Sequence, residues 1–199
     1  ALPPDLRPRL SAAADRVGLS GAALQRMQPW MVATLLTLRA AHSAGFGTDQ
    51  GVDLWLARTA RARGLPLVAL ESVDRQIEAL AAGGDAAQLA SLVEVVELIE
   101  RGAAPAYFAG MLAAWRGGDA AAIDRIVREE SASPAMAPLL ADLLDARNRE
   151  MADAIVARLQ PGRRVFVAVG AGHFGGDAGL LAALSGRGFT LRQVEAKDD

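Results

Sequence analysis

Apolar residues recur with a helical period along most of the 199-residue chain, and this periodicity restricts its fold more than any other feature. The apolar residues are mostly Ala and Leu, which favour helix, whereas Phe, Trp and Tyr together make up 5%. Glycine or proline interrupts the pattern at most of its ends. The sequence therefore predicts helices over 5–17, 21–42, 49–63, 73–82, 85–101, 105–116, 119–130, 135–160 and 174–187.

Three short segments depart from the helical pattern and have the composition of β-strands. Residues 65–70 and 165–169 are almost wholly apolar, and residues 189–194 alternate between apolar and polar side chains. Continuous apolarity is typical of parallel strands with helices on both faces, and alternation is typical of an edge strand. We therefore expect a helix-rich α/β fold in a single domain over 1–199. It contains a small, mostly parallel sheet and a large helical insert at about 73–160.

Charge, cysteine content and hydropathy exclude several classes of protein. Because the chain has no cysteine, it forms no disulfide framework, thiolate zinc site or iron–sulfur cluster. The 21 basic and 23 acidic residues are evenly spread, so we expect no nucleic-acid partner. The longest apolar run, 29–38, is shorter than the about 20 residues of a membrane span, and we expect no transmembrane segment. The N-terminus shows no export signal.

Two polar loops directly follow the two apolar segments. Glu71 follows the first, and the sequence Gly170-Ala171-Gly172-His173 follows the second. Sites form at the carboxyl ends of parallel strands, so we expect Glu71 and His173 at one edge of the sheet. Glu71 is either a solvated carboxylate near a helix start or a functional group. His173 is either a neutral imidazole that ties the glycine loop down, or a metal ligand or general base.

The predicted helix at 135–160 carries two polar residues within its apolar surface. Arg147 lies in an otherwise apolar row with a spacing of four residues, and Asn148 lies beside it. An inward-facing guanidinium needs a partner, for which Glu71 is a candidate, or an anionic group of a substrate. The alternative is that the Arg147 side chain runs along the apolar stripe and reaches solvent.

A glycine pattern offers a different hypothesis for the second loop. Gly170, Gly172 and Gly175 match the G-x-G-x-x-G pattern of dinucleotide-binding loops, and Glu195 follows 20 residues after Gly175. Only four residues follow Glu195, whereas a dinucleotide fold continues through further βα units. Dinucleotide binding at 170–175 is therefore our third hypothesis. The signature motifs of serine hydrolases, P-loop proteins and zincins do not occur in the sequence.

Taken together, an ordered set of motifs resembles the TraB/PrgY/GumN family, which includes the Tiki proteins. The order and spacing agree over nearly the whole chain, and the combination is more specific than any single motif. The motifs are Pro29-Trp30, Gly51-Val52-Asp53, the segment from Leu65 to Gln76, the segment from Arg147 to Ala152, and the segment from Val165 to Phe174.

The resemblance implies a metal-dependent hydrolase, in particular a peptidase, that acts on a peptide or protein. The expected catalytic centre of the family contains two G-x-x-H motifs and acidic residues, and His173 ends the second motif. The resemblance predicts a divalent ion, such as Zn²⁺, Mn²⁺ or Co²⁺, on His173 and Glu71. Glu71 is then a ligand or general base, and Arg147 an electrophilic or structural partner. Gly170, Gly172 and Asn148 are expected to contact substrate.

The resemblance also implies a cellular location and a departure from the family pattern. Bacterial GumN-type members are commonly exported, which suggests the periplasm or cell envelope, with the cytoplasm as the alternative. The family's first G-x-x-H strand and the acidic strand after it would precede Ala1, so we expect an N-terminally incomplete member. One histidine and one glutamate do not make a three-ligand zinc site, and the chain alone is expected to be incomplete or inactive.

A function from another class is the alternative to the hydrolase. The incomplete histidine set favours a non-catalytic, envelope-associated interaction module that binds a partner through the helices at about 85–130. Missing strands would also leave an exposed sheet edge, which predicts a homodimer.

Overall fold

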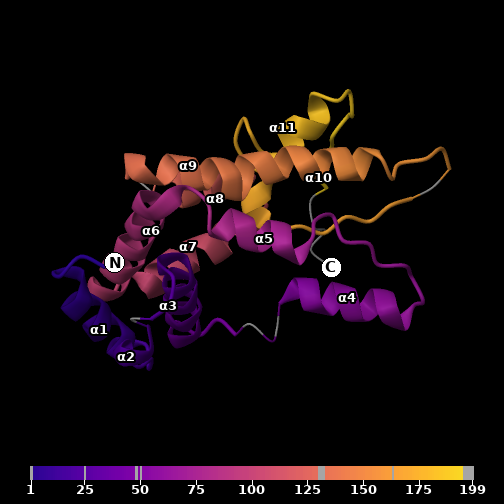
Figure 1. Cartoon of the computed structure of the whole chain (residues 1–199). Coiled ribbons are helices and arrows are strands. Elements are labelled where there is room, and N and C mark those ends of the chain that lie inside the picture. Colours follow the sequence, from indigo (N-terminus) through magenta and orange to yellow (C-terminus); the bar gives the residue numbers. More distant parts are fainter. Residues whose placement is uncertain are drawn as a thin grey trace.

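The computed structural model describes residues 2–24, 26–47, 49, 51–129, 133–162 and 164–194, and most of these residues are helical (Figure 1). A π-helical turn, η3 (Ala141–Ala146), joins two of the helices, and two short 3₁₀ turns are η2 (Pro134–Met136) and η4 (Ala171–His173). The α-helices are α1 (Leu6–Arg16), α2 (Gly21–Leu24), α3 (Pro29–Ser43), α4 (Val52–Ala62), α5 (Val73–Leu80), α6 (Gly84–Glu100), α7 (Ala104–Arg116), α8 (Ala120–Glu129), α9 (Ala137–Leu140), α10 (Arg147–Val156) and α11 (Leu180–Ser185).

The positions of the helices agree with those predicted from the sequence periodicity, except where a proline or a glycine determines the backbone conformation. The predicted helix over 21–42 is divided because Pro29 begins α3, and the preceding Gln28 has an extended ψ of 144°. The predicted helix over 174–187 begins only at Leu180. Before it, Gly176 has a φ of +75°, which glycine adopts without strain.

The main hydrophobic core lies among α1, α2, α3, α6 and α7. Leu10 of α1, Leu36 of α3 and Leu92 of α6 are fully buried there. The helix α6 belongs to the predicted insert, yet it packs against both α1 and α3 near the N-terminus. The insert helix α6 therefore helps to build this core.

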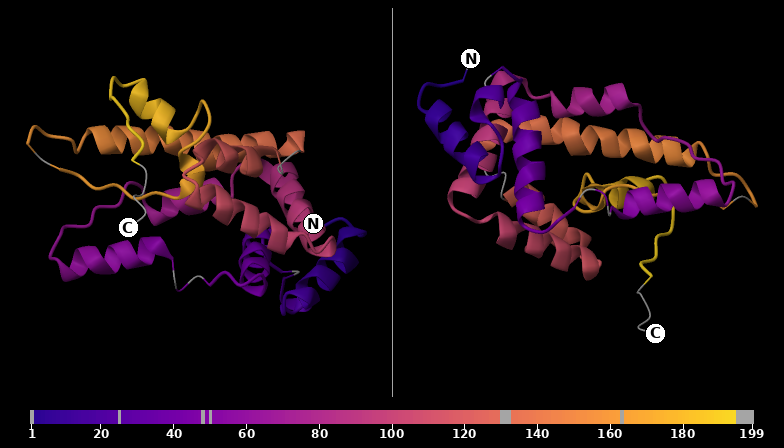
Figure 2. Two further views of the ribbon diagram at one scale, coloured as in Figure 1. Left: turned by 180° about the vertical axis from the view of Figure 1, so that it is seen from behind. Right: turned by 90° about the horizontal axis from the view of Figure 1, so that it is seen from below.

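A second layer is the long helical rod formed by η2, α9, η3 and α10 (Figures 1 and 2). The helix α5 packs against η3, and α11 packs against α10. Met151 and Ile155 of α10 and Leu180 of α11 form a small buried cluster between these helices. The rod thus contacts the two helices, α5 and α11, that follow the loops carrying Glu71 and His173.

The structure contradicts the predicted α/β fold, since no residue that it describes is in a β-strand. Segments 65–70, 165–169 and 189–194 are irregular. Among the described residues, their backbone groups make no hydrogen bonds with one another. The two backbone bonds at their starts are helix-end bonds, from Leu65 N to Ala60 O at 2.9 Å and from Phe189 N to Leu184 O at 3.3 Å. The prediction of a small parallel sheet is therefore wrong.

The apolar residues of these segments are only partly covered. Leu70, Val167 and Val169 pack against the cluster between α10 and α11, whereas the side chain of Phe166 is exposed and the residue has 79% of its surface accessible. Apolar composition predicts that a segment will be buried, but a strand also needs a hydrogen-bonded neighbour. Here, the helices α10 and α11 cover part of segments 65–70 and 165–169, and no described segment pairs with the backbone of any of the three.

The helix α4 has no buried residue, and it lies apart from the main core in Figure 1. None of the described helices is by itself long and apolar enough to cross a membrane. The helices α5 and α6 together reach the required length and apolar content, but they are bent by 81° at the break between them.

Candidate functional site

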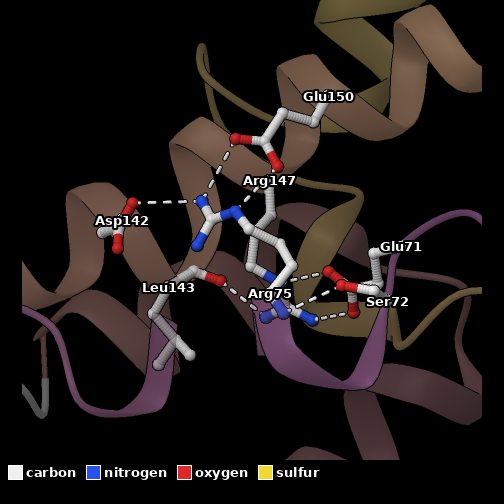
Figure 3. Close-up of polar contacts among 7 residues, drawn as sticks. All are labelled: Glu71, Ser72, Arg75, Asp142, Leu143, Arg147 and Glu150. Atoms are coloured by element: carbon white, nitrogen blue, oxygen red, sulfur yellow. Dashed lines mark hydrogen bonds and ion pairs between the residues drawn. The ribbon is translucent and has the colours of Figure 1, made fainter. Parts of the chain in front are cut away.

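Glu71 and Arg147 form a two-pronged ion pair between the loop before α5 and the first residue of α10 (Figure 3). Arg147 Nε donates to Glu71 Oε2 at 2.8 Å, and Arg147 Nη2 donates to Glu71 Oε1 at 2.5 Å. The Arg147 side chain is 7% exposed and the Glu71 side chain is 18% exposed. The guanidinium therefore faces inward, and the pairing with Glu71 that the sequence favoured is present.

The turn before α10 supplies a third contact to Arg147. Its Nη1 donates to the backbone carbonyl of Leu143 at 2.8 Å, and Leu143 lies within the π-helical turn η3. Such π-helical turns often lie at functional sites. With three of its five N–H groups bonded, the guanidinium is held in one orientation, and its two other N–H groups have no partner among the residues that the structure describes.

A second arginine fixes the start of α5, which follows Glu71 directly (Figure 3). The Ser72 hydroxyl accepts a hydrogen bond from the backbone N–H of Arg75 at 3.0 Å and caps the helix. The Arg75 side chain bonds to two carboxylates of the rod, to Glu150 at 2.9 Å and to Asp142 at 3.1 Å. These contacts tie the Glu71 loop to η3 and α10.

Asn148, the next residue of α10, contacts the second loop. Its Oδ1 lies 2.7 Å from His173 Nδ1, and its Nδ2 donates to the carbonyl oxygen of Ala178 at 2.9 Å. Asn148 is 1% exposed and His173 is 9% exposed. Consecutive residues of one helix, Arg147 and Asn148, thus hold the two loops: Arg147 binds Glu71, and Asn148 binds His173.

The other ring nitrogen of His173 is open. Within the described part of the chain, no group bonds to Nε2, and no fully buried side-chain nitrogen or oxygen lacks a hydrogen-bond partner. Because Nε2 has no such partner, it is not fully buried and keeps some surface exposed to solvent, although His173 as a whole is 9% exposed. The imidazole is therefore anchored through Nδ1 and accessible through Nε2.

The charges of the site favour a neutral imidazole beside an ionised carboxylate. Burial lowers the pKa of His173 below its ordinary value; the positive charge of Arg147 lowers it further, and Glu71 opposes both effects. The hydrogen bonds from Arg147 lower the pKa of Glu71, although partial burial opposes this shift. The charge of Glu71 raises the pKa of His173 and that of His173 lowers the pKa of Glu71, which agrees with their contacts to adjacent residues of α10.

A sequence model of the TraB/PrgY/gumN family matches residues 1–193. The chain belongs to this family. The resemblance that the ordered motifs indicated is thus confirmed, and the motifs with Glu71, Arg147, Asn148 and His173 meet in one site of this TraB/PrgY/gumN chain. No curated protein and no solved structure matches the chain.

The glycines of the His173 loop differ in their surroundings. A Cβ at Gly172 would have no neighbouring atom within 4 Å, and one at Gly170 would meet only His173 Cδ2, at 3.7 Å. A Cβ at Gly175 would lie 2.8 Å from Asp124 Cβ and closer still to the carbonyl oxygen of Ala120. The backbone at Gly170 and Gly172 is therefore open to an approaching molecule, whereas Gly175 allows the loop to pack against α8.

The glycine pattern lacks the context of a dinucleotide-binding loop. Segment 165–169 is not a strand, and the pattern opens the short turn η4, whereas the next α-helix begins only at Leu180. The acidic residue of the hypothesis, Glu195, lies outside the described residues. The strand, turn and helix that would hold a pyrophosphate are thus not formed at 170–175.

The described side chains do not form a complete metal site. In the portion of the chain that the structure describes, no group of three or more His, Cys, Asp or Glu residues could hold an ion. His173 Nε2 and Glu71 are two candidate donors, and both Glu71 oxygens already accept hydrogen bonds from Arg147. A catalytic zinc ion takes three protein ligands and water, so these two donors alone do not fit one.

Sequence reasoning missed the groups that support the site. The contact of Arg75 with Asp142 and Glu150 leaves a signal in the sequence. These two acidic residues are eight positions apart, so they lie on one face of a helix. The Ala178 and Leu143 carbonyls are backbone groups, for which no side-chain pattern gives a signal.

Proposed function

We propose that this chain carries a hydrolytic site of the TraB/GumN type and that its substrates are peptides or proteins. The observation that carries the proposal is the state of His173. Its imidazole is bonded through Nδ1 to Asn148 and has no described partner at Nε2, and burial together with the charge of Arg147 lowers its pKa, which favours the neutral form. Glu71, whose pKa is lowered by Arg147, is bonded to the adjacent residue of α10. A neutral imidazole nitrogen in such a position accepts a proton from water or binds a metal ion.

The other side chains take complementary roles in this proposal. Arg147 keeps Glu71 ionised and in place through its paired hydrogen bonds. The two remaining N–H groups of Arg147 are available to stabilise an oxyanion. Glu71 attracts positive charge that develops on the imidazole as Nε2 takes up a proton. The open backbone at Gly170 and Gly172 gives a substrate room to approach this nitrogen.

We extend the proposal to a divalent ion and to a location on the grounds of family membership alone. When bound, such an ion would supply Lewis-acid polarisation of the scissile carbonyl. The two donors described here do not complete its coordination, so other ligands would have to come from water, substrate or another part of a complete site. The proposed location is the periplasm or cell envelope, with the cytoplasm as the alternative.

An interaction module is the second candidate function, and exposed apolar side chains favour it. They lie mainly on α4 and on the irregular segments rather than on the helices at about 85–130, and include Trp55, Leu67, Val68 and Phe166. A second copy of the chain that covers them would form the homodimer of this candidate.

A peptide hydrolysis assay tests the proposed function. Because the two described donors do not complete a metal site, we expect only slow cleavage of quenched fluorescent peptides by the chain alone, with Zn²⁺, Mn²⁺ or Co²⁺ present. His173→Ala is expected to lower the rate by about 100-fold, because general acid–base catalysis typically contributes that much or more. The matched control is His42→Ala, which changes the only other histidine, an exposed residue near the end of α3. Equal rates for the protein and His173→Ala, or no cleavage with any ion, would contradict the hydrolase and favour the interaction module.

A further inference from the structure

Both ends of the Asn148 amide make contacts inside the protein. Its oxygen faces the His173 ring and its nitrogen faces the Ala178 carbonyl, at 2.7 Å and 2.9 Å. Asn148 is 1% exposed, so neither end of the amide is available to a substrate. The substrate contact expected for Asn148 from the sequence stays a prediction, and the geometry favours a different role.

The Ala178 carbonyl fixes the direction of this amide. A carbonyl oxygen only accepts hydrogen bonds, so the NH₂ group of Asn148 must face Ala178. The amide oxygen then faces His173 Nδ1, and an oxygen only accepts. A neutral His173 must therefore carry its proton on Nδ1, since two facing acceptors would leave a buried repulsive contact. This assignment follows from the chemistry of the backbone carbonyl.

We propose that Asn148 is a positioning residue that holds neutral His173 in the Nδ1–H tautomer and leaves the lone pair on Nε2. A neutral histidine free in water prefers the opposite tautomer, so the protein has to supply this selection. Two linked hydrogen bonds supply this selection: the Asn148 amide bonds to the Ala178 carbonyl at one end and to the His173 ring at the other. The use of Nε2 in hydrolysis rests on the proposed function, whereas the tautomer itself does not.

The choice of tautomer matters for the chemistry of His173 because only one of its two ring nitrogens is accessible. Nδ1 is covered by Asn148, and Nε2 is the nitrogen that solvent reaches. With the proton on Nε2, the ring would present a donor to the site and could neither accept a proton there nor bind a cation. Asn148 thus decides whether the accessible nitrogen is basic.

Nitrogen-15 NMR of histidine-labelled protein tests the proposal, since proton–nitrogen couplings distinguish the two tautomers. Spectra are taken at about pH 8, above the ordinary pKa of histidine, without metal or substrate. We expect His173 in the protein to be protonated on Nδ1. In Asn148→Ala the preference should reverse, so that Nε2–H predominates. In Asn148→Asp an oxygen still faces Nδ1, and we expect Nδ1 to keep its proton, but the second carboxyl oxygen then faces the Ala178 carbonyl, so this variant is expected to be less stable. His42 provides an internal reference that none of these changes moves.

The outcomes separate this inference from a purely structural role of Asn148 and from the proposed function. A structural role alone would lower stability in Asn148→Ala and leave the tautomer unchanged, which would overturn the inference. An Nε2–H tautomer in the unaltered protein would also overturn it, even if Asn148→Ala did not fold. If the tautomer is as expected but hydrolysis does not depend on His173, the proposed function fails and the positioning role of Asn148 stands.

Discussion

Arg147→Met is expected to lower the free energy of unfolding by about 3 kcal/mol, because removal of one partner of a buried ion pair leaves the other uncompensated. Methionine keeps an unbranched apolar side chain in the row on α10, so the main loss is the charge and its hydrogen bonds. Glu71, whose side chain is 18% exposed, would lose both donors, and the Leu143 carbonyl would lose a third. Urea unfolding followed by circular dichroism measures the change.

Two further variants make this prediction specific to the buried pair. The double variant Glu71→Gln/Arg147→Met removes both charges and should recover more than half of the loss. Arg75→Met is the control, because the carboxylates it contacts, on Glu150 and Asp142, are 51% and 38% exposed, and we expect a loss of about 1 kcal/mol or less. An Arg147→Met protein no less stable than Arg75→Met would show that the Glu71–Arg147 contact contributes little.

Gly175→Ala is expected to lower the free energy of unfolding by about 3 kcal/mol, at the upper end for overpacked sites. The new Cβ would lie 2.8 Å from Asp124 Cβ and press against the Ala120 carbonyl, which belongs to the backbone at the start of α8. Since a backbone carbonyl in a helix cannot turn aside, the His173 loop or α8 would have to move. Loss of the cooperative urea transition would be the extreme form of the same result.

Gly172→Ala is the matched control in the same loop. A Cβ at this position meets no atom within 4 Å, and its φ is not positive, so stability should change by no more than about 0.5 kcal/mol. If the two variants were equally stable, the packing of the loop against α8 would not depend on a glycine at position 175.

The composition of the site was predictable from the sequence, but for a partly incorrect reason. Glu71 and His173 were expected together because parallel strands end at one sheet edge, and the described residues contain no sheet. They share a site because Arg147 and Asn148, adjacent on α10, bind one loop each. The inward direction of Arg147 was readable from its apolar row, since a helix repeats every 3.6 residues.

The helices were predictable and the segments between them were not, for a physical reason. Helical hydrogen bonds form within a segment, so periodicity and glycine breaks are enough to locate α1, α6 or α7. Strand hydrogen bonds need a partner elsewhere, and the apolar residues of 165–169 do not specify one. Val167 and Val169 do pack against helices, as their apolar character indicated, but their backbones do not pair in the described structure.

Calorimetric titration with Zn²⁺ at about pH 8 tests most directly the central claim, that His173 Nε2 is the open donor of the site. The account predicts weak, one-site binding to the protein, a loss of at least about tenfold in affinity in His173→Ala, and no change in His42→Ala. No binding to the unaltered protein, or undiminished binding to His173→Ala, would contradict the claim.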